Sequence, residues 1–332
     1  MDEFSLIEKY FNWPISFNKS NIIKAIGDDC AIIDPKFNSH LLITTDCLIE
    51  NVHFPKNTSP ELIASKSLAV NLSDLAAMGG YPAWYTLVIG LPLDIDEKWL
   101  KSFSQALFEQ SKRYQIDLIG GDTVKSEQLF ITIQMHGYAH NNIMQRDKAI
   151  EGDIIAVTGS LGAAALGLRL VLGDKKFKSL PLTDIEKEAA LNALNSPKPQ
   201  IDLGIKISKF SQCALDISDG LMADLEHITS KSHCGAQIDI DKIPLADCLL
   251  KLPREEAIKL ALTGGDDYQL CFTITNENWM KIQADKFLSE QCTDIGKIVS
   301  TKGIQLLYQD TTINQLAGCD LEQLQKGYNH FN

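Results

Sequence analysis

Apolar residues along this chain follow two periods, one typical of helices and one typical of strands. Residues 96–114 place Leu100, Phe103 and Leu107 at helical spacing, whereas residues 129–136 alternate apolar and polar positions as a half-buried strand does. Segments of the two kinds alternate through the whole chain, and no repeat occurs at the periods of solenoid proteins. This order predicts an α/β, or mixed α+β, fold.

Turn and capping residues divide the chain into its expected elements. Ser59 and Pro60 form an N-cap and first-turn pair that begins a helix, and Ser218 is expected to cap another helix. The expected helices are residues 60–78 and 96–114, the segment that follows residues 158–162 and continues through 172, and residues 218–230. The expected strands are residues 41–45, 84–89, 117–119, 129–136, 154–157, 213–217, 258–262 and 268–274.

The length of 332 residues suggests two domains, at about 150 residues per domain. We expect an N-terminal mixed-sheet domain over 1–145, a C-terminal α/β domain over 146–305 and an extension over 306–332. The most apolar stretch, residues 154–172, is interrupted by glycines and by Arg169. It therefore predicts a strand, a turn and a helix rather than a membrane span.

The chain is acidic, with 31 Lys and Arg against 43 Asp and Glu and a net charge of −12. This balance argues against nucleic-acid or anionic-membrane partners, which need an excess of Lys and Arg. It suits divalent cations if the carboxylates cluster. The 8 cysteines form no CxxC pair and the first residues lack a secretory signal, which predicts a reducing, cytoplasmic location.

Many of the aspartates occur beside Gly, Ser or Thr in short segments within apolar sequence. Burying ionised carboxylates is costly unless they are paired or bound to metal, and few Lys or Arg residues lie near these segments. Mg²⁺ takes oxygen ligands and shares them with substrate phosphates, while neighbouring glycines let the backbone approach a phosphate. The segments are 27–29, 44–46, 71–74, 120–123, 216–220 and 264–267.

Taken singly, these segments also have structural interpretations. Asp219 fits a helix cap, and Gly-Gly-Asp is a common turn sequence. Residues 158–167, TGSLGAAALG, fit either a loose phosphate loop or tight packing of small residues, and His53 fits a partly buried histidine as well as a ligand contact. For Asp74 the functional interpretation is favoured, because a lone charge in an apolar helix needs a partner. The functional interpretation rests on the joint occurrence of all six aspartate segments. No P-loop or GxGxxG fingerprint is present.

With these residues assembled, the sequence resembles the thiamine-monophosphate kinase family, part of the aminoimidazole ribonucleotide synthetase superfamily of ATP-using enzymes. The resemblance covers essentially the whole chain. Its most specific segments are IGDDCAII, TTDCLIENVHF, AVNLSDLAAMGGYPAW, LIGGDT, DISDGLMADLEHI and LTGGDDYQLCFT.

The resemblance implies two α/β domains and a homodimer in which the sheets of the N-terminal domains meet. It implies that the N-terminal domain binds ATP and Mg²⁺ and that the C-terminal extension contributes to the substrate site. ATP and several Mg²⁺ ions would be required, and direct in-line transfer of the γ-phosphate would convert thiamine monophosphate to thiamine diphosphate.

The resemblance also implies roles for individual residues. The metal-binding residues would be Asp28, Asp29, Thr44, Thr45, Asp46, Asp74, Asp122, Asp216 and Asp219. Positions associated with the nucleotide are matched by Gly121, Asp122, Arg146 and Ser218, and positions associated with the substrate by His53, Asp266 and Tyr328. Metal-bound Asp46 and Asp122 would support the transfer, and no residue is implied as a general base.

One departure from the family pattern concerns Asp266. Many relatives have Gly-Gly-Glu-Asp-Tyr where this chain has Gly-Gly-Asp-Asp-Tyr, so the carboxylate is one methylene shorter and its substrate contact would be lost, shifted or bridged by water. Two alternatives stay open. One is another ATP-using enzyme of the superfamily, such as a selenophosphate synthetase-like or purine-pathway synthetase-like protein. The other is a noncatalytic metal- or nucleotide-binding protein.

Overall fold

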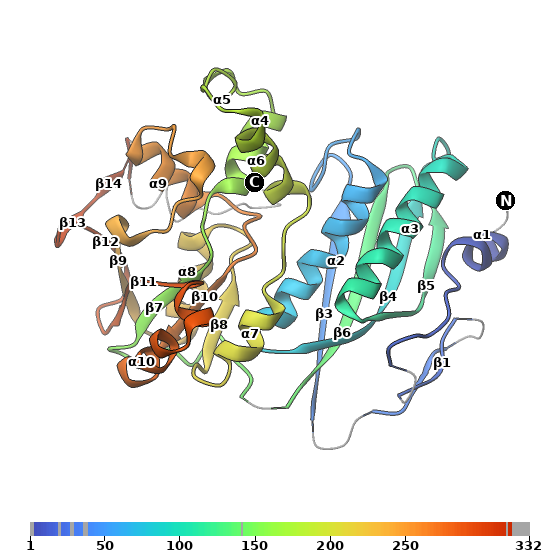
Figure 1. Cartoon of the computed structure of the whole chain (residues 1–332), viewed down its shortest axis with the longest axis horizontal. Coiled ribbons are helices and arrows are strands. Elements are labelled where there is room, and N and C mark those ends of the chain that lie inside the picture. Colours follow the sequence, from blue (N-terminus) through green and yellow to red (C-terminus); the bar gives the residue numbers. More distant parts are fainter. Residues whose placement is uncertain are drawn as a thin grey trace. The chain divides into compact units, whose positions relative to one another are not determined.

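A computed structural model describes residues 3–18, 21–26, 30–35, 39–140, 142–316 and 318–320 (Figure 1). The chain divides into two compact units, the first formed by Met1–Leu75 and Gly80–His140 and the second by Ala76–Gly79 and Asn141–Asn332. No helix in the described ranges is long and apolar enough to cross a lipid bilayer. The functions expected for 1–145, 146–305 and 306–332 stay predictions.

The first unit is built around one sheet. Its helices are α1 (Glu3–Tyr10), α2 (Pro60–Ala77) and α3 (Glu97–Tyr114). Its strands are β1 (Ile22–Lys24), β2 (Ile32–Ile33), β3 (His40–Ile49), β4 (Tyr81–Leu91), β5 (Asp117–Lys125) and β6 (Phe130–Ala139).

The 4-stranded sheet of this unit has the order β3-β6-β4-β5, with only β4 and β5 parallel. That parallel pair needs a crossover, which α3 supplies. Helices α2 and α3 lie against the same face of the sheet (Figure 1). The helical spacing of Leu100, Phe103 and Leu107 is confirmed, because all three are buried in α3.

Strands β3 and β5 are longer than the sequence pattern predicts. The expectation that the first strand stops at Asp46 is wrong, because β3 continues to Ile49 and pairs with β6 over its full length. Likewise Asp122 lies inside β5 rather than after it, paired with Val88 of β4. Ladder hydrogen bonds hold polar residues in a strand even where local propensity is low. Both aspartates therefore stand on sheet faces rather than in turns.

The second unit contains the remaining elements. Its helices are α4 (Ala163–Val171), α5 (Lys175–Lys178), α6 (Asp184–Asn195), α7 (Ile201–Ile207), α8 (Leu221–Lys231), α9 (Arg254–Thr263), α10 (Asn276–Ala284) and α11 (Lys286–Ser289), with short 3-10 helices at Ile240–Lys242 and Asp247–Leu249. Its strands are β7 (Ile154–Thr158), β8 (Cys213–Asp216), β9 (Gly235–Asp239), β10 (Leu270–Ile274), β11 (Cys292–Val299), β12 (Gly303–Tyr308), β13 (Thr311–Ile313), β14 (Gln315–Leu316) and β15 (Cys319–Asp320).

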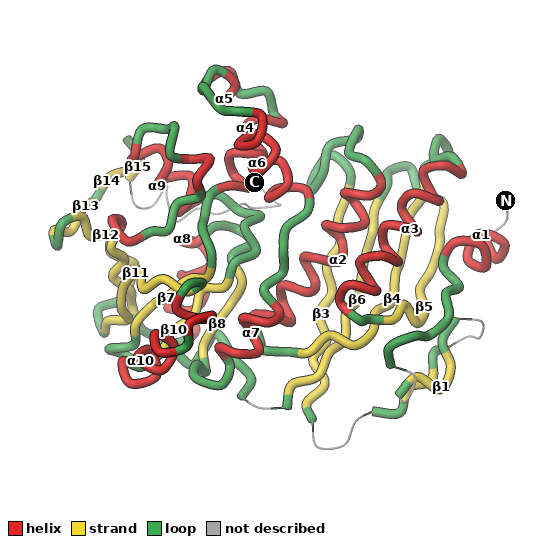
Figure 2. Tube along the Cα trace, in the orientation of Figure 1, coloured by secondary structure: helices red, strands yellow, loops and turns green. Residues whose placement is uncertain are grey.

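A 7-stranded sheet in the order β13-β12-β9-β11-β7-β10-β8 forms the centre of this unit (Figure 2). Successive residues of its central strands enter two different cores, as the period of 2 requires. Ile155 and Val157 of β7 pack with α8 and α9, whereas Ala156 packs with α7 and α10. Helices therefore cover both faces of the sheet, which confirms the α/β class.

Two predictions in this unit are wrong. Residues 258–262 belong to helix α9 and not to a strand, since Ile258, Ala261 and Leu262 pack as one helical face against the same core as α8. A short apolar run is ambiguous between strand and helix, and here tertiary packing decides. Ser218 does not cap α8, because the N-cap residue is Gly220 and no side chain caps from that position.

Candidate functional site

In the first unit, side chains of β3 and α2 meet on the helix-covered face of the sheet. Oγ1 of Thr44 donates a hydrogen bond to Oδ2 of Asp74. Two residues further along the strand, the amide of Asp46 donates to Oδ1 of Asn71 at 3.2 Å. Residues two apart share a face of a strand, so Asp46 lies on the same side as Thr44. The structure thus brings Thr44 and Asp46 to the helix that carries Asp74.

Two other residues of the predicted metal site lie on the opposite face of this sheet. Thr45 and Cys47 alternate with Asp46 along β3 and therefore face away from α2. Across the sheet, the register aligns Asp122 of β5 with Cys47. Paired residues share a face, so Asp122 and Thr45 project from the side that α2 and α3 leave open. Within one chain, Asp46 and Asp122 are not brought together.

His53 lies in the turn that follows β3. Its Nδ1 accepts a hydrogen bond from the amide of Ile49 at 3.0 Å, so a neutral ring carries its proton on Nε2. The side chain of Lys66, a buried residue of α2, donates to the carbonyl of His53 at 3.3 Å. Sequence reasoning missed Lys66, although a lysine inside the apolar run LIASKSLAV is the signal that could have found it.

In the second unit, the turns over residues 216–220 and 264–268 are joined by hydrogen bonds. The amide of Asp266 donates to the carbonyl of Ser218 at 2.8 Å. Asp216, the last residue of β8, is only 4% exposed. Residues predicted for the metal (Asp216 and Asp219), for the nucleotide (Ser218) and for the substrate (Asp266) therefore belong to a single assembly of two turns.

The backbone of Asp266 explains why a short carboxylate occurs at this position. Its φ of 66° lies in the left-handed region, which Asp tolerates better than residues with longer side chains. The hydroxyl of Tyr268 donates to its Oδ1 at 3.2 Å, which fixes the carboxylate close to the turn. The backbone at this position is therefore well suited to the Asp of this chain.

A residue that sequence reasoning missed, Asp224 of α8, holds the first of these turns. Its Oδ2 accepts hydrogen bonds from the amides of Ser218, Asp219 and Gly220 at 2.9, 3.0 and 3.2 Å. The signal lay in the helix pattern, because Asp224 shares the apolar face of α8 with Leu221 and so needed local donors. Asp219 is not the N-cap residue of α8, because that position is occupied by Gly220.

A second missed carboxylate, Asp267, holds the start of α4. Its Oδ2 accepts a hydrogen bond from the amide of Gly162 at 2.7 Å. Gly162 is the N-cap residue of α4, where a phosphate loop would present its amides to a ligand. In this chain an internal carboxylate takes that position, which favours the packing interpretation of TGSLGAAALG over the phosphate-loop interpretation.

Both missed carboxyl groups have strongly raised pKa values. Burial raises the pKa of Asp267 to about 7, although hydrogen bonds from the amides of Gly162 and Ala164 act in the opposite direction. Burial also raises the pKa of Asp224 to about 7, and the nearby charges of Asp216 and Asp219 add to that effect. In each case the cost of removing a charge from water outweighs the hydrogen bonds that favour ionisation.

The remaining predicted residues are placed singly or fall outside the described ranges. Gly121 lies so close to β4 that an added Cβ would be 1.8 Å from the carbonyl oxygen of Leu87, so only glycine fits there. Arg146 is exposed in the loop before β7, and its carbonyl accepts a hydrogen bond from Ser232. The predictions for Asp28, Asp29 and Tyr328 lie outside the described residues.

Within the described part of the chain, no group of 3 or more His, Cys, Asp or Glu side chains is arranged to hold a metal ion. The metal ligand set therefore stays a prediction.

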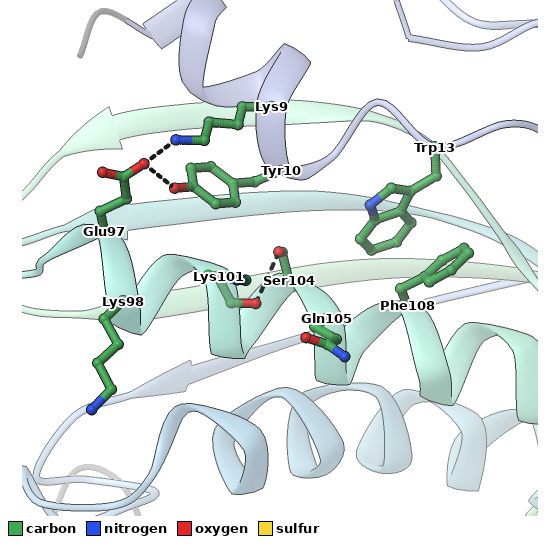
Figure 3. A pocket seen from close by; sticks show the side chains of 9 residues that line it. All are labelled: Lys9, Tyr10, Trp13, Glu97, Lys98, Lys101, Ser104, Gln105 and Phe108. Atoms are coloured by element: carbon green, nitrogen blue, oxygen red, sulfur yellow. Dashed lines mark hydrogen bonds and ion pairs between the residues drawn. The ribbon is translucent and has the colours of Figure 1, made fainter.

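A separate pocket of about 630 Å³ lies between α1 and α3 on the first unit (Figure 3). At one end, Lys9 and Tyr10 both donate hydrogen bonds to Glu97. At the other, the rings of Trp13 and Phe108 lie 5.0 Å apart. None of the predicted site residues is among the described side chains that line it, so we assign it no part in the chemistry.

Two family models together match most of the chain. Residues 27–139 match the N-terminal domain of AIR synthase related proteins, and residues 151–309 match their C-terminal domain.

Individual relatives narrow this assignment. The chain is 42% identical to the thiamine-monophosphate kinase of Haemophilus influenzae over 90% of its own length and 89% of that protein's. It resembles the crystal structure of thiamine-monophosphate kinase from Stenotrophomonas maltophilia with a TM-score of 0.79 and 37% identity, covering 87% and 92% of the two chains. It also resembles AaThiL in complex with AMPPCP and TMP, with a TM-score of 0.75 and 30% identity over 99% and 96%. The chain therefore belongs to the thiamine-monophosphate kinase family.

Proposed function

We propose that this enzyme transfers the γ-phosphate of ATP to thiamine monophosphate, which gives thiamine diphosphate and ADP. The observation that carries the proposal is the likeness, over 99% of the chain, to a structure complexed with AMPPCP and TMP. Those two ligands are a nonhydrolysable ATP analogue and a phosphate acceptor, the pair that a kinase brings together. The linked turns at 216–220 and 264–268 support the same assignment, because predicted nucleotide and substrate residues lie side by side there.

The acceptor chemistry accounts for the lack of a predicted general base. A phosphate monoester has a second pKa near 6, so it is mostly a dianion at pH 7 and already nucleophilic. The obstacle is repulsion between this dianion and the nucleotide. Two unit charges 4 Å apart interact by roughly 4 kcal/mol at an effective dielectric constant of 20, and several such pairs are present. We infer direct in-line transfer, for which charge compensation and orientation are the main needs.

The donor chemistry of the predicted ligands fits Mg²⁺, since carboxylate and hydroxyl oxygens are the hard ligands this ion prefers. Thr44, Asp46 and Asp74 would hold Mg²⁺ in the first unit, and Asp216 and Asp219 in the second. When bound, Mg²⁺ supplies positive charge that offsets the repulsion between the phosphates. The chain itself orients these residues, through the hydroxyl of Thr44 for Asp74 and through the carboxylate of Asp224, which accepts from the backbone amide of Asp219.

Asp266 and His53 are assigned to the thiamine phosphate. The thiazolium ring of thiamine is cationic, and a carboxylate held at a fixed turn is a suitable partner for it. Contacts with neighbouring groups orient both residues, the Tyr268 hydroxyl for Asp266 and the Ile49 amide for His53. Tyr328 keeps its predicted substrate role, which awaits a direct test.

We also propose that the open face of the first sheet binds a second copy of the chain. Leu41 and Ile43 are 44% and 57% exposed on β3, an edge strand, on the face that points away from α2. On the same face, Nδ1 of His136 is buried without a hydrogen-bond partner among the described residues. An apolar surface with an unsatisfied polar atom is typical of an interface. The absence of nucleic-acid and membrane partners stays a prediction from the net charge of −12, and a cytoplasmic location stays a prediction from the cysteine pattern.

One experiment tests the proposed reaction against its alternatives. The purified protein is incubated with ATP, Mg²⁺ and thiamine monophosphate, and the products are separated by chromatography. We expect thiamine diphosphate and ADP in equal amounts. Turnover of a different acceptor alone would indicate another enzyme of the superfamily, and nucleotide binding without any turnover would indicate a noncatalytic binding protein.

A further inference from the structure

Asp224 occupies an unusual place at the start of α8. It lies inside the helix, yet its carboxylate reaches back to the amides of Ser218, Asp219 and Gly220, which precede the helix. In a capping box, an acidic side chain of the first helical turn reaches back in a similar way to the amide of the N-cap residue. Here the N-cap is Gly220, and the carboxylate of Asp224 binds its amide and the amides of the two residues before it.

The position of Gly220 explains why residue 220 carries no capping side chain. Its φ of 115° is a backbone conformation that favours glycine, and an added Cβ would lie 2.8 Å from the carbonyl carbon of Thr263 in α9. A Ser, Thr or Asp cap therefore cannot be built at residue 220. Asp224 is instead the side chain that holds the amides just before the helix.

The same turn is held from its other side. The carbonyl of Ser218 accepts the amide of Asp266, and an added Cβ on Gly265 would lie 2.3 Å from that carbonyl oxygen. Asp224 thus binds the amides of the turn, while the amide of Asp266 binds the carbonyl of Ser218 in the same turn. These two sets of contacts fix the backbone of the turn and so determine the direction in which the side chains of Ser218 and Asp219 point.

We propose that Asp224 is a positioning residue for phosphoryl transfer, which aligns Asp219 and Ser218 for metal and nucleotide without touching either ligand. This inference rests on the proposed function. Asp224 is only 4% exposed and its three donors are backbone amides, which supports a role through the turn rather than through the substrate. Supporting residues of this kind typically change metal affinity by about 10- to 100-fold when they are replaced.

The test compares Asp224→Leu, which removes the acceptor, with Asp224→Asn, which keeps an acceptor oxygen. The first readout is hydrogen–deuterium exchange at the amides of residues 218–220, which needs no activity. We expect faster exchange there in Asp224→Leu and near-normal protection in Asp224→Asn. Unchanged protection in the leucine variant would overturn the proposal. If that variant does not fold, Asp224→Ala, which also removes the acceptor, takes its place, and unchanged protection at residues 218–220 in Asp224→Ala overturns the proposal.

The second readout is the Mg²⁺ concentration that gives half-maximal rate, together with KM for ATP. We expect about a 10- to 100-fold rise for Asp224→Leu and partial rescue by Asp224→Asn. The matched control is Asp153→Asn, because Asp153 is a buried carboxylate that accepts from Ile150 and Thr273 just before β7 begins. It should lower stability without changing the Mg²⁺ requirement.

Equal changes in the Mg²⁺ requirement for the Asp153 and Asp224 variants would show that Asp224 only supports the fold. The proposed function fails separately, if the wild-type protein makes no thiamine diphosphate. In that case the exchange experiment still reports whether Asp224 holds the turn.

Discussion

The two units support their aspartates in different ways. In the first unit, Asp46 and Asp74 are half-buried on regular elements, and a threonine hydroxyl is the partner of Asp74. In the second unit, Asp216 and Asp219 belong to a turn whose amides are held by a buried carboxylate. A strand or helix keeps its shape without its polar side chains, whereas this turn depends on Asp224.

This difference separates function from stability. Neutralising a carboxylate in the first unit should remove activity and leave the fold intact, because the backbone there is held by ladder and helix hydrogen bonds. In the second unit the two effects are coupled, since the carboxylates that hold the turns are themselves buried. The following predictions test that contrast, in order of decreasing effect.

The largest effect is expected for the pH dependence of stability through Asp267. Burial raises its folded-state pKa to about 7, above the 3.8 usual for an aspartate, so the folded state retains a proton that the unfolded state releases between these pH values. Stability from this group is present below about pH 4 and is lost as pH rises toward 7, by up to about 4 kcal/mol. Asp267→Asn should therefore be more resistant to urea than wild type at pH 8.

The urea measurement is made at pH 5 and pH 8 for wild type, Asp267→Asn and the exposed control Glu188→Gln. The difference between wild type and Asp267→Asn should grow with pH, while the control follows wild type. If Asp267→Asn is equally less stable at both pH values, the carboxylate is ionised in the folded state and the burial argument is wrong.

The next effect is on activity through Asp46. Asp46→Asn should lower kcat/KM for ATP by at least about 100-fold, or about 2.7 kcal/mol of transition-state stabilisation, because an amide balances less metal charge. Its melting temperature should stay close to that of wild type, since β3 is held by its pairing with β6. Steady-state kinetics measure the fall in kcat/KM, and thermal unfolding measures the melting temperature. Asp94→Asn, with a side chain 70% exposed, is the control, and wild-type turnover by Asp46→Asn would refute the assignment.

A smaller effect is expected at the open sheet face. Ile43→Lys should weaken the dimer by at least about tenfold, because a two-fold interface places both new charges in the same contact. Sedimentation velocity over a range of concentrations measures the change. Ile185→Lys, at a site 80% exposed on α6, should leave the association unchanged. A wild-type protein that stays monomeric throughout would show that this face has another role.

The smallest effect is expected for Asp266→Glu. Substrate binding should change by no more than about threefold, since the carboxylate is kept. The free energy of unfolding should fall by about 1 kcal/mol, because the left-handed backbone at this residue suits Asp better than Glu. KM for thiamine monophosphate and urea unfolding measure the two quantities. An increase in stability would contradict the backbone explanation.

The sequence predicted those parts of the fold whose signals are local. Helix α3 shows its period in the sequence, and that prediction is confirmed. Residues 258–262 were misassigned as a strand, because a short apolar run does not reveal whether its neighbours are strands or helices. The end of β3 was placed too early, since pairing with β6 extends the strand beyond Asp46.

The candidate site was predictable in its residue types but not in its supports. Asp216 and Asp266 could be named from their segments, yet the hydrogen bonds between their turns join residues far apart in sequence. Asp224 and Asp267 were missed because a buried acceptor is defined by the donors that surround it. Similarly, the opposite faces of Asp46 and Asp122 follow from strand register, which neither segment encodes alone.

The central claim is a single direct transfer of phosphate from ATP to thiamine monophosphate. It is tested most directly with ATP made chiral at the γ-phosphorus by oxygen isotopes, followed by analysis of the terminal phosphate of the product. One in-line displacement inverts the configuration, so we predict thiamine diphosphate of inverted configuration. Retention of configuration would require a phosphoenzyme and would contradict direct transfer, and label found only in inorganic phosphate would contradict the assignment of the acceptor.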